Sequence, residues 1–96
     1  MANFAKINGN LVTEVIVVAN SDCDDLPFPD SEPVGQAFIA SLGIEGDWLQ
    51  TSYNSNFRGT YAGIGYTYDA SLGQYGEFIA PVVEPEPAPV TPTIKK

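Results

Sequence analysis

The chain has 96 residues, with 12 acidic and 4 basic side chains, a formal net charge of −8, one cysteine and no histidine. This charge argues against binding a nucleic acid or an anionic membrane surface, because both need Lys and Arg to replace counterions. With Cys23 alone and no histidine, the chain lacks the usual residues for a disulfide within the chain, a zinc site or nucleophilic catalysis. We therefore expect no enzyme, no metal and no cofactor.

The N-terminal residues lack the basic start and apolar core of a signal peptide, and no apolar run reaches the roughly twenty residues of a membrane span. We expect a product that stays in the cytoplasm or is assembled there into something larger. A domain of about eighty residues buries a hydrophobic core that stabilises the fold only marginally. A partner or a host assembly is the natural source of further stability.

A β-hairpin is the first element that the sequence predicts. Two β-prone runs, residues 4–7 and 11–18, flank Asn8 and Gly9. Asn-Gly favours a two-residue type I′ turn, in which both central residues take positive φ. The second run alternates at first and ends continuously apolar, which indicates a strand that enters the core.

Residues 19–29 are polar and interrupted by prolines, so they predict a loop. Five acids crowd this loop and the residues after it: Asp22, Asp24, Asp25, Asp30 and Glu32. An EF-hand loop starting at Asp22 would need Gly and Glu where the chain has Pro27 and Pro33. We expect a solvated acidic loop near a helix N-terminus, and an irregular calcium site stays open. Cys23 lies between two aspartates, which favours a structural thiol over a reactive one.

A short helix is predicted over residues 31–42. Ser31 can cap it, Pro33 suits its first turn, and Gly43 can end it in a left-handed conformation. Apolar residues recur every four positions and would face the sheet, with two small residues permitting close approach: Val34, Phe38 and Leu42, with Ala37 and Ala40.

The second half of the domain predicts a strand over residues 48–53 and a second hairpin. In that hairpin, residues 64–68 and 75–79 flank a turn at 69–73. The fold class is therefore α+β: a small β-rich domain over residues 1–80, with two hairpins and one short helix. Residues 81–96 form an extended, acidic, Pro-rich tail, because its prolines exclude helix and central strand and favour polyproline II.

Eight of the eleven aromatic residues fall between Trp48 and Phe78, in a stretch rich in Gly, Tyr and Asn. Such a composition suits rigid contact surface, since rings supply area with few rotors. Arg58 is the one cation in the middle of the chain, so we expect it to pair with a carboxylate at a turn or interface. The predicted partner contacts are Trp48, Tyr53, Arg58, Tyr61, Tyr66 and Tyr68, with Pro85, Pro87 and Pro89 stiffening the tail.

Enzyme hypotheses find little support in these residues. A carboxylate pair such as Glu14 and Glu45 could in principle serve glycoside hydrolysis, which also needs a cleft. The glycines of Gly63-Ile-Gly65 lack the third glycine and the helix of a dinucleotide-binding loop. A bulge or close backbone packing is the simpler interpretation of those glycines.

Several strings resemble a group of small proteins encoded by tailed bacteriophages, especially those of marine cyanobacteria. They are residues 3–10, 15–18, 35–43, 48–54 and 61–69, and the run Tyr61-Ala-Gly-Ile-Gly-Tyr-Thr-Tyr-Asp is the most specific. The likeness covers about residues 2–81. Similar chains often continue with a further aromatic segment, where this chain has its acidic proline tail.

The resemblance implies a virion structural protein. The first hypothesis is a capsid decoration or cement protein, present in many copies and bound to the major capsid protein, with a tail that reaches across a neighbouring subunit. The alternative is a tail- or fibre-associated module that contacts the host surface through protein or glycan. A non-virion protein of host takeover is the third.

Overall fold

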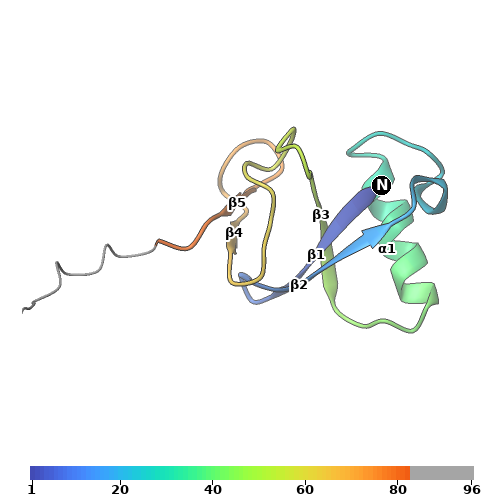
Figure 1. Cartoon of the computed structure of the whole chain (residues 1–96), viewed down its shortest axis with the longest axis horizontal. Coiled ribbons are helices and arrows are strands. Elements are labelled where there is room, and N and C mark those ends of the chain that lie inside the picture. Colours follow the sequence, from blue (N-terminus) through green and yellow to red (C-terminus); the bar gives the residue numbers. More distant parts are fainter. Residues whose placement is uncertain (83–96) are drawn as a thin grey trace, which may run out of the picture.

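Five antiparallel strands form one sheet, in the order β3-β1-β2-β4-β5, in the computed structural model, which describes residues 1–82 (Figure 1). One α-helix accompanies the sheet, so the predicted α+β class, mostly β, is confirmed. In chain order the elements are β1 (Ala2–Asn8), β2 (Leu11–Val18), the 3-10 turn η1 (Asn20–Cys23), α1 (Ser31–Ser41), β3 (Asp47–Thr51), β4 (Thr67–Asp69) and β5 (Glu77–Ile79). Within these residues, no helix combines the length and hydropathy needed to cross a bilayer.

The first hairpin joins β1 to β2, as predicted, but its turn lies one residue further along. Asn8 pairs with Leu11, so the two turn residues are Gly9 and Asn10. Of these two, Gly9 alone has a positive φ, of 67°. The expected type I′ turn on Asn8 and Gly9 is therefore wrong, and a glycine at the first of two turn positions is the pattern of type II′.

Strand β1 lies in the middle of the fold and is covered on both faces. One core cluster joins it to η1 and α1, and consists of Ala2, Phe4, Val18, Cys23, Ile39 and Trp48. The other lies on the opposite face, and consists of Ala5, Ile7, Val12, Ala62 and Phe78. Successive strand residues point to opposite faces, so the alternation of Phe4 and Ala5 assigns each to its own cluster.

Helix α1 is buried through a face one residue away from the predicted one, although the predicted Phe38 also packs, partly buried, against the cluster that contains Ile39. Its buried residues are Ser31, Gly35 and Ile39, whereas Leu42 is 58 % exposed. A Cβ at Gly35 would overlap the Phe4 ring and lie 3.0 Å from Cys23 Sγ. The missing side chain of Gly35, rather than Ala37 or Ala40, therefore allows the helix to approach the sheet closely.

The C-terminal end of α1 agrees with the sequence-based prediction, and the N-terminal end differs from it. Gly43 takes the expected left-handed conformation, with a φ of 78°. Asp30 is the N-cap residue, and no side chain caps the helix. The hydroxyl of Ser31 instead donates a hydrogen bond to Gln50 Oε1 at 2.6 Å, because Ser31 is buried against β3.

The second hairpin, β4–β5, is also confirmed. Tyr68 pairs with Phe78, and the turn after β4 is held by the Ser71 backbone amide, which donates to Asp69 Oδ1 at 2.9 Å. The strands are shorter than predicted, because the chain before β4 bonds to the first hairpin instead. There, Gly65 N donates to Val12 O at 2.9 Å.

Candidate functional site

Arg58 is the centre of a hydrogen-bond network with Glu32, Gln50 and Tyr75, which we call the Arg58 network. Its Nη1 and Nη2 both bind the Glu32 carboxylate, Nη2 at 3.1 Å from Oε1. Nη1 also donates to Gln50 O at 3.0 Å, and Nε donates to Tyr75 O at 3.0 Å. The expected carboxylate pair is thereby confirmed.

The Arg58 side chain is only 6 % exposed, and Glu32 is 16 % exposed. The guanidinium carbon lies 5.1 Å from the centre of the Phe28 ring and 5.7 Å from that of Tyr68. Arg58 therefore makes its contacts within the domain, and little of its side chain is exposed for contact with a partner.

Several backbone groups on the two outer strands, β3 and β5, have hydrogen-bond partners. On β3, Gln36 Nε2 donates to Trp48 O at 2.6 Å, and Gln50 N donates to Glu32 Oε2 at 2.7 Å. On β5, Phe78 N donates to the carbonyl oxygen of Arg58 at 2.9 Å. Open edge strands are templates for pairing with another chain. Because these edge groups already have partners, we expect contacts with other proteins to run through side chains.

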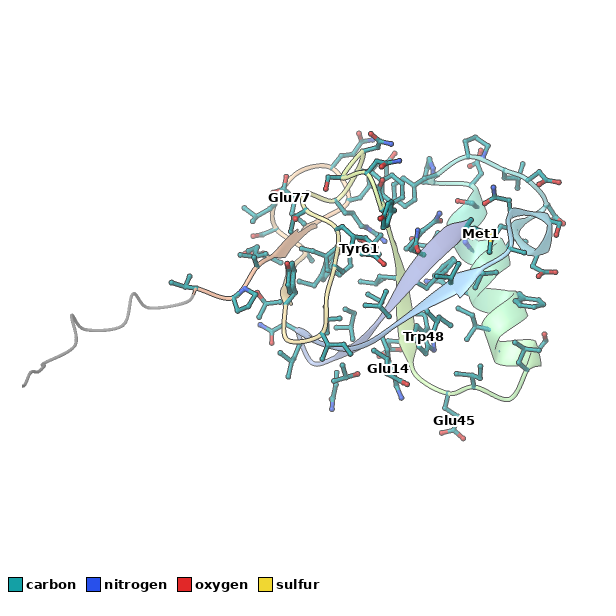
Figure 2. The ribbon with its side chains drawn as sticks, in the orientation of Figure 1. Met1, Glu14, Glu45, Trp48, Tyr61 and Glu77 are labelled. Atoms are coloured by element: carbon teal, nitrogen blue, oxygen red, sulfur yellow. The ribbon has the colours of Figure 1, made fainter. Side chains whose placement is uncertain are left out.

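Three of the predicted aromatic contact residues pack in or against the core clusters, Trp48 buried and the two tyrosines partly buried. Trp48 is 4 % exposed, packs in the cluster that includes Ile39 of α1, and donates its indole N–H to Glu45 O at 3.3 Å (Figure 2). Tyr66 and Tyr68 pack against the cluster on the opposite face, and the Tyr68 hydroxyl donates to Tyr75 O at 2.6 Å. Trp48 and these two tyrosines therefore share no face of the sheet.

Tyr53 and Tyr61, in contrast, lie together at the surface. Their ring centres are 5.3 Å apart, with an angle of 69° between the planes. Tyr53 is 71 % exposed. The two rings border a hollow of about 430 Å³, which we call the tyrosine groove; it is lined by Met1, Asn3, Val17, Tyr53, Asn54 and Tyr61. None of these six side chains carries a charge.

Asn3 gives the groove a polar group that the fold leaves without a partner. The residue is only 7 % exposed, and its side-chain amide makes no hydrogen bond within residues 1–82. Buried polar side chains nearly always have a partner, so this one needs an explanation. A ligand in the groove would supply it.

A second hollow, of about 420 Å³, lies between the end of α1 and the start of β3. We call it the helix-end hollow; it is lined by Gln36, Ala40, Ile44, Gly46, Asp47, Trp48 and Leu49. It shares no residue with the tyrosine groove. The two hollows lie at opposite ends of β3, because Asp47 begins that strand and Tyr53 follows its end.

The acidic loop does not gather its carboxylates. Among residues 1–82, no group of three or more His, Cys, Asp or Glu side chains is arranged to hold a metal ion, and Glu32 belongs to the Arg58 network. Cys23 is buried, and that burial, followed by the charges of Asp22 and Asp24, raises the pKa of its thiol. This agrees with the expected structural thiol.

The carboxylates considered for hydrolysis lie outside both hollows. Glu14, whose side chain is 57 % exposed, faces Lys6 with 3.6 Å between Oε1 and Nζ. Glu45 is exposed and precedes β3. Neither residue lines the tyrosine groove or the helix-end hollow.

Sequence reasoning identified the two tyrosines of the groove and missed its other four residues, Met1, Asn3, Val17 and Asn54. Nothing in the sequence singled these out: Val17 lies inside the apolar run 15–18, and only the structure shows that it is 55 % exposed. Pro85, Pro87 and Pro89 lie outside the described residues.

No protein family, curated protein or solved structure matches the chain. The site is therefore interpreted from its own geometry.

Proposed function

We propose that the chain is a structural protein of a phage virion: a capsid decoration or cement protein that binds the major capsid protein. Its resemblance to small phage proteins supports the virion, and the two separate hollows support the decoration role. The hollows have similar volumes, about 420 and 430 Å³, and lie at opposite ends of β3. A domain with two contact surfaces can bind two neighbouring subunits of a shell at once.

Surface chemistry adds to this proposal. Each hollow exposes an apolar or aromatic side chain on a short connection next to β3. Ile44, in the loop between α1 and β3, is 40 % exposed, and Tyr53, in the turn after β3, is 71 % exposed. Contact residues held by a rigid scaffold lose little conformational entropy on binding. The net charge of −8 and the bonded backbone groups of β3 and β5 oppose association of the copies through these two strands.

Reconstitution on phage heads tests the proposal. Purified full-length chain is added to heads of a phage that lacks the gene, and the bound copies are counted after sedimentation. We expect saturable binding, on the order of hundreds of copies per head, as the symmetry of a shell requires. Binding that never saturates, or binding to tails and not to heads, would contradict the decoration role.

Three variants relate binding to the two hollows. Ile44→Ser alters the helix-end hollow and Tyr53→Ala alters the tyrosine groove, and we expect each to lower occupancy. Leu72→Ser is the matched control, since Leu72 is 38 % exposed in the β4–β5 turn and lines neither hollow. If all three variants occupy the heads equally, the two hollows are not the surfaces that bind the capsid.

The second candidate is a tail- or fibre-associated module that contacts the host surface. The observation that favours it is the grouping of two tyrosine rings with Asn3 and Asn54 in one groove. Ring faces and amides are groups that bind sugars as well as proteins. Copy number separates the two candidates, because a fibre or baseplate component is present in far fewer copies than a shell protein.

A further inference from the structure

The tyrosine groove combines three properties that together define a class of ligand. It has one aromatic wall, formed by the Tyr53 and Tyr61 rings in edge-to-face contact with 5.3 Å between their centres. It holds one buried amide, that of Asn3, without a partner among the described residues. It has no charged side chain in its lining. Its volume of about 430 Å³ lies within the range of small-ligand and peptide sites.

An extended proline-rich peptide meets all three requirements. In the polyproline II conformation the backbone makes no internal hydrogen bonds, so its carbonyl oxygens are free to accept from a side-chain amide. Proline rings pack on aromatic faces, and the conformation is formed before binding, which lowers the entropy cost. Aromatic-lined grooves that recognise such peptides are a recurrent mode of protein interaction.

The chain carries such a peptide in its own tail. Residues 87–94 read Pro-Ala-Pro-Val-Thr-Pro-Thr-Ile and contain no charged residue. Pro89 and Pro92 are three residues apart, which places them on the same side of a polyproline II helix, about 9 Å from each other. The flanking charges, Glu86 before the segment and Lys95 after it, fall outside the uncharged stretch.

The geometry points to a neighbouring copy as the source of this peptide. In Figure 1 the chain leaves β5 on the side of the molecule away from the N-terminus and α1, whereas Met1 lines the groove. Only four residues, 83–86, separate Val82 from the uncharged segment, so the start of that segment lies at most about 18 Å from Val82. A second copy is free to present its segment from any direction.

We propose that residues 87–94 of one copy bind in the tyrosine groove of another copy, with Asn3 donating to a backbone carbonyl of the peptide. Each copy then offers one peptide and one groove. Such a contact is head-to-tail, so it links copies into open chains or closed rings. The proposal goes beyond the virion role and does not depend on it, because both halves of the contact lie in this chain.

Sedimentation velocity of the full-length chain, without any phage particle, tests the proposal. We expect the sedimentation coefficient to rise with protein concentration. Tyr53→Ala removes one of the two rings of the aromatic wall, and Pro89→Ala combined with Pro92→Ala alters the peptide. Each change should weaken self-association about tenfold or more. Leu42→Ala is the matched control for an exposed apolar side chain, since Leu42 is 58 % exposed and lines neither hollow.

Mixing the two altered proteins gives the most specific result. The Tyr53→Ala protein keeps its peptide, and the double proline variant keeps its groove. The mixture should therefore form a heterodimer that grows no further, although each protein alone stays largely monomeric. Circular dichroism of each variant verifies that the domain is folded.

Three results would overturn the proposal. The first is a wild-type chain that stays monomeric up to millimolar concentration. A chain whose groove binds the tail of the same molecule would also give this result, and it would equally contradict binding between copies. The second is self-association that both altered proteins retain. The third is a glycan that perturbs the NMR signals of Tyr53 and Asn3 while the double proline variant associates like the wild type, which would assign the groove to a sugar.

Discussion

Removing the Arg58 side chain should destabilise the domain more than any other change to a single charge. Arg58→Met leaves the Glu32 carboxylate, which is 16 % exposed, without its cation. It also removes the donor to Gln50 O and one of the two donors to Tyr75 O, which keeps the Tyr68 hydroxyl. Breaking a buried ion pair by removing one partner costs about 3–5 kcal/mol. Small domains have a total stability of about 5–15 kcal/mol, so this loss is a large fraction.

Urea denaturation followed by tryptophan fluorescence measures this loss. Trp48 is the single tryptophan and is 4 % exposed, so its emission reports unfolding. With a slope of about 1.5 kcal/mol per M, a loss of 3 kcal/mol lowers the urea midpoint by about 2 M. Glu32→Gln combined with Arg58→Met should lose less than the sum of the single changes, because the unpaired charge is then gone.

Lys6→Met is the matched control for this prediction. It also replaces a cation by an apolar chain, but the Lys6 and Glu14 side chains are 34 % and 57 % exposed. Exposed pairs contribute about 0–1 kcal/mol. If Arg58→Met lowers the free energy of unfolding no more than Lys6→Met does, the Arg58 network does not hold the fold as described.

Three further predictions follow from local geometry. Gly35→Ala places a Cβ into the Phe4 ring and should lower the free energy of unfolding by about 1–3 kcal/mol, measured by the same urea titration. Hydrogen bonds from the Ser71 side chain and backbone lower the pKa of Asp69. Their contribution to stability is therefore complete above the ordinary Asp pKa of about 3.9 and is lost as pH falls through the lower folded value. In an NMR titration of the Asp69 carboxyl carbon, Ser71→Ala should move the pKa upward, and an unchanged pKa would contradict this cause. Finally, burial and then the charges of Asp22 and Asp24 raise the pKa of the Cys23 thiol, so alkylation at pH 8 should be about tenfold slower or more in the native protein than in denaturant. Equal rates would show that the thiol is accessible.

The elements of this fold were predictable where the signal is local. The helix end at Gly43 was predictable from the residue type alone, because a residue without Cβ takes positive φ at little cost. The two β-prone runs that flank Asn8 and Gly9 assign the first hairpin by themselves. The face of α1 was not predictable in this way, since it depends on the fit of Gly35 against Phe4, which lies on another element.

The candidate site depends on contacts that sequence spacing does not show. The Arg58–Glu32 pair joins residues 26 positions apart, and nothing near Arg58 in the sequence singles out Glu32 among twelve acids. The tyrosine groove likewise joins Asn3 and Val17 of the first hairpin to Tyr53 and Tyr61. Composition indicated that this stretch holds contact residues, and the tertiary fold decides which of its rings reach the surface.

The most direct test of the proposed function is quantitative mass spectrometry of gradient-purified phage particles, expressed as copies of this chain per portal ring. The decoration role predicts a count comparable to that of the major capsid protein. A count of a few to a few tens would contradict it and favour the tail apparatus. Absence of the chain from the particles would contradict any virion role.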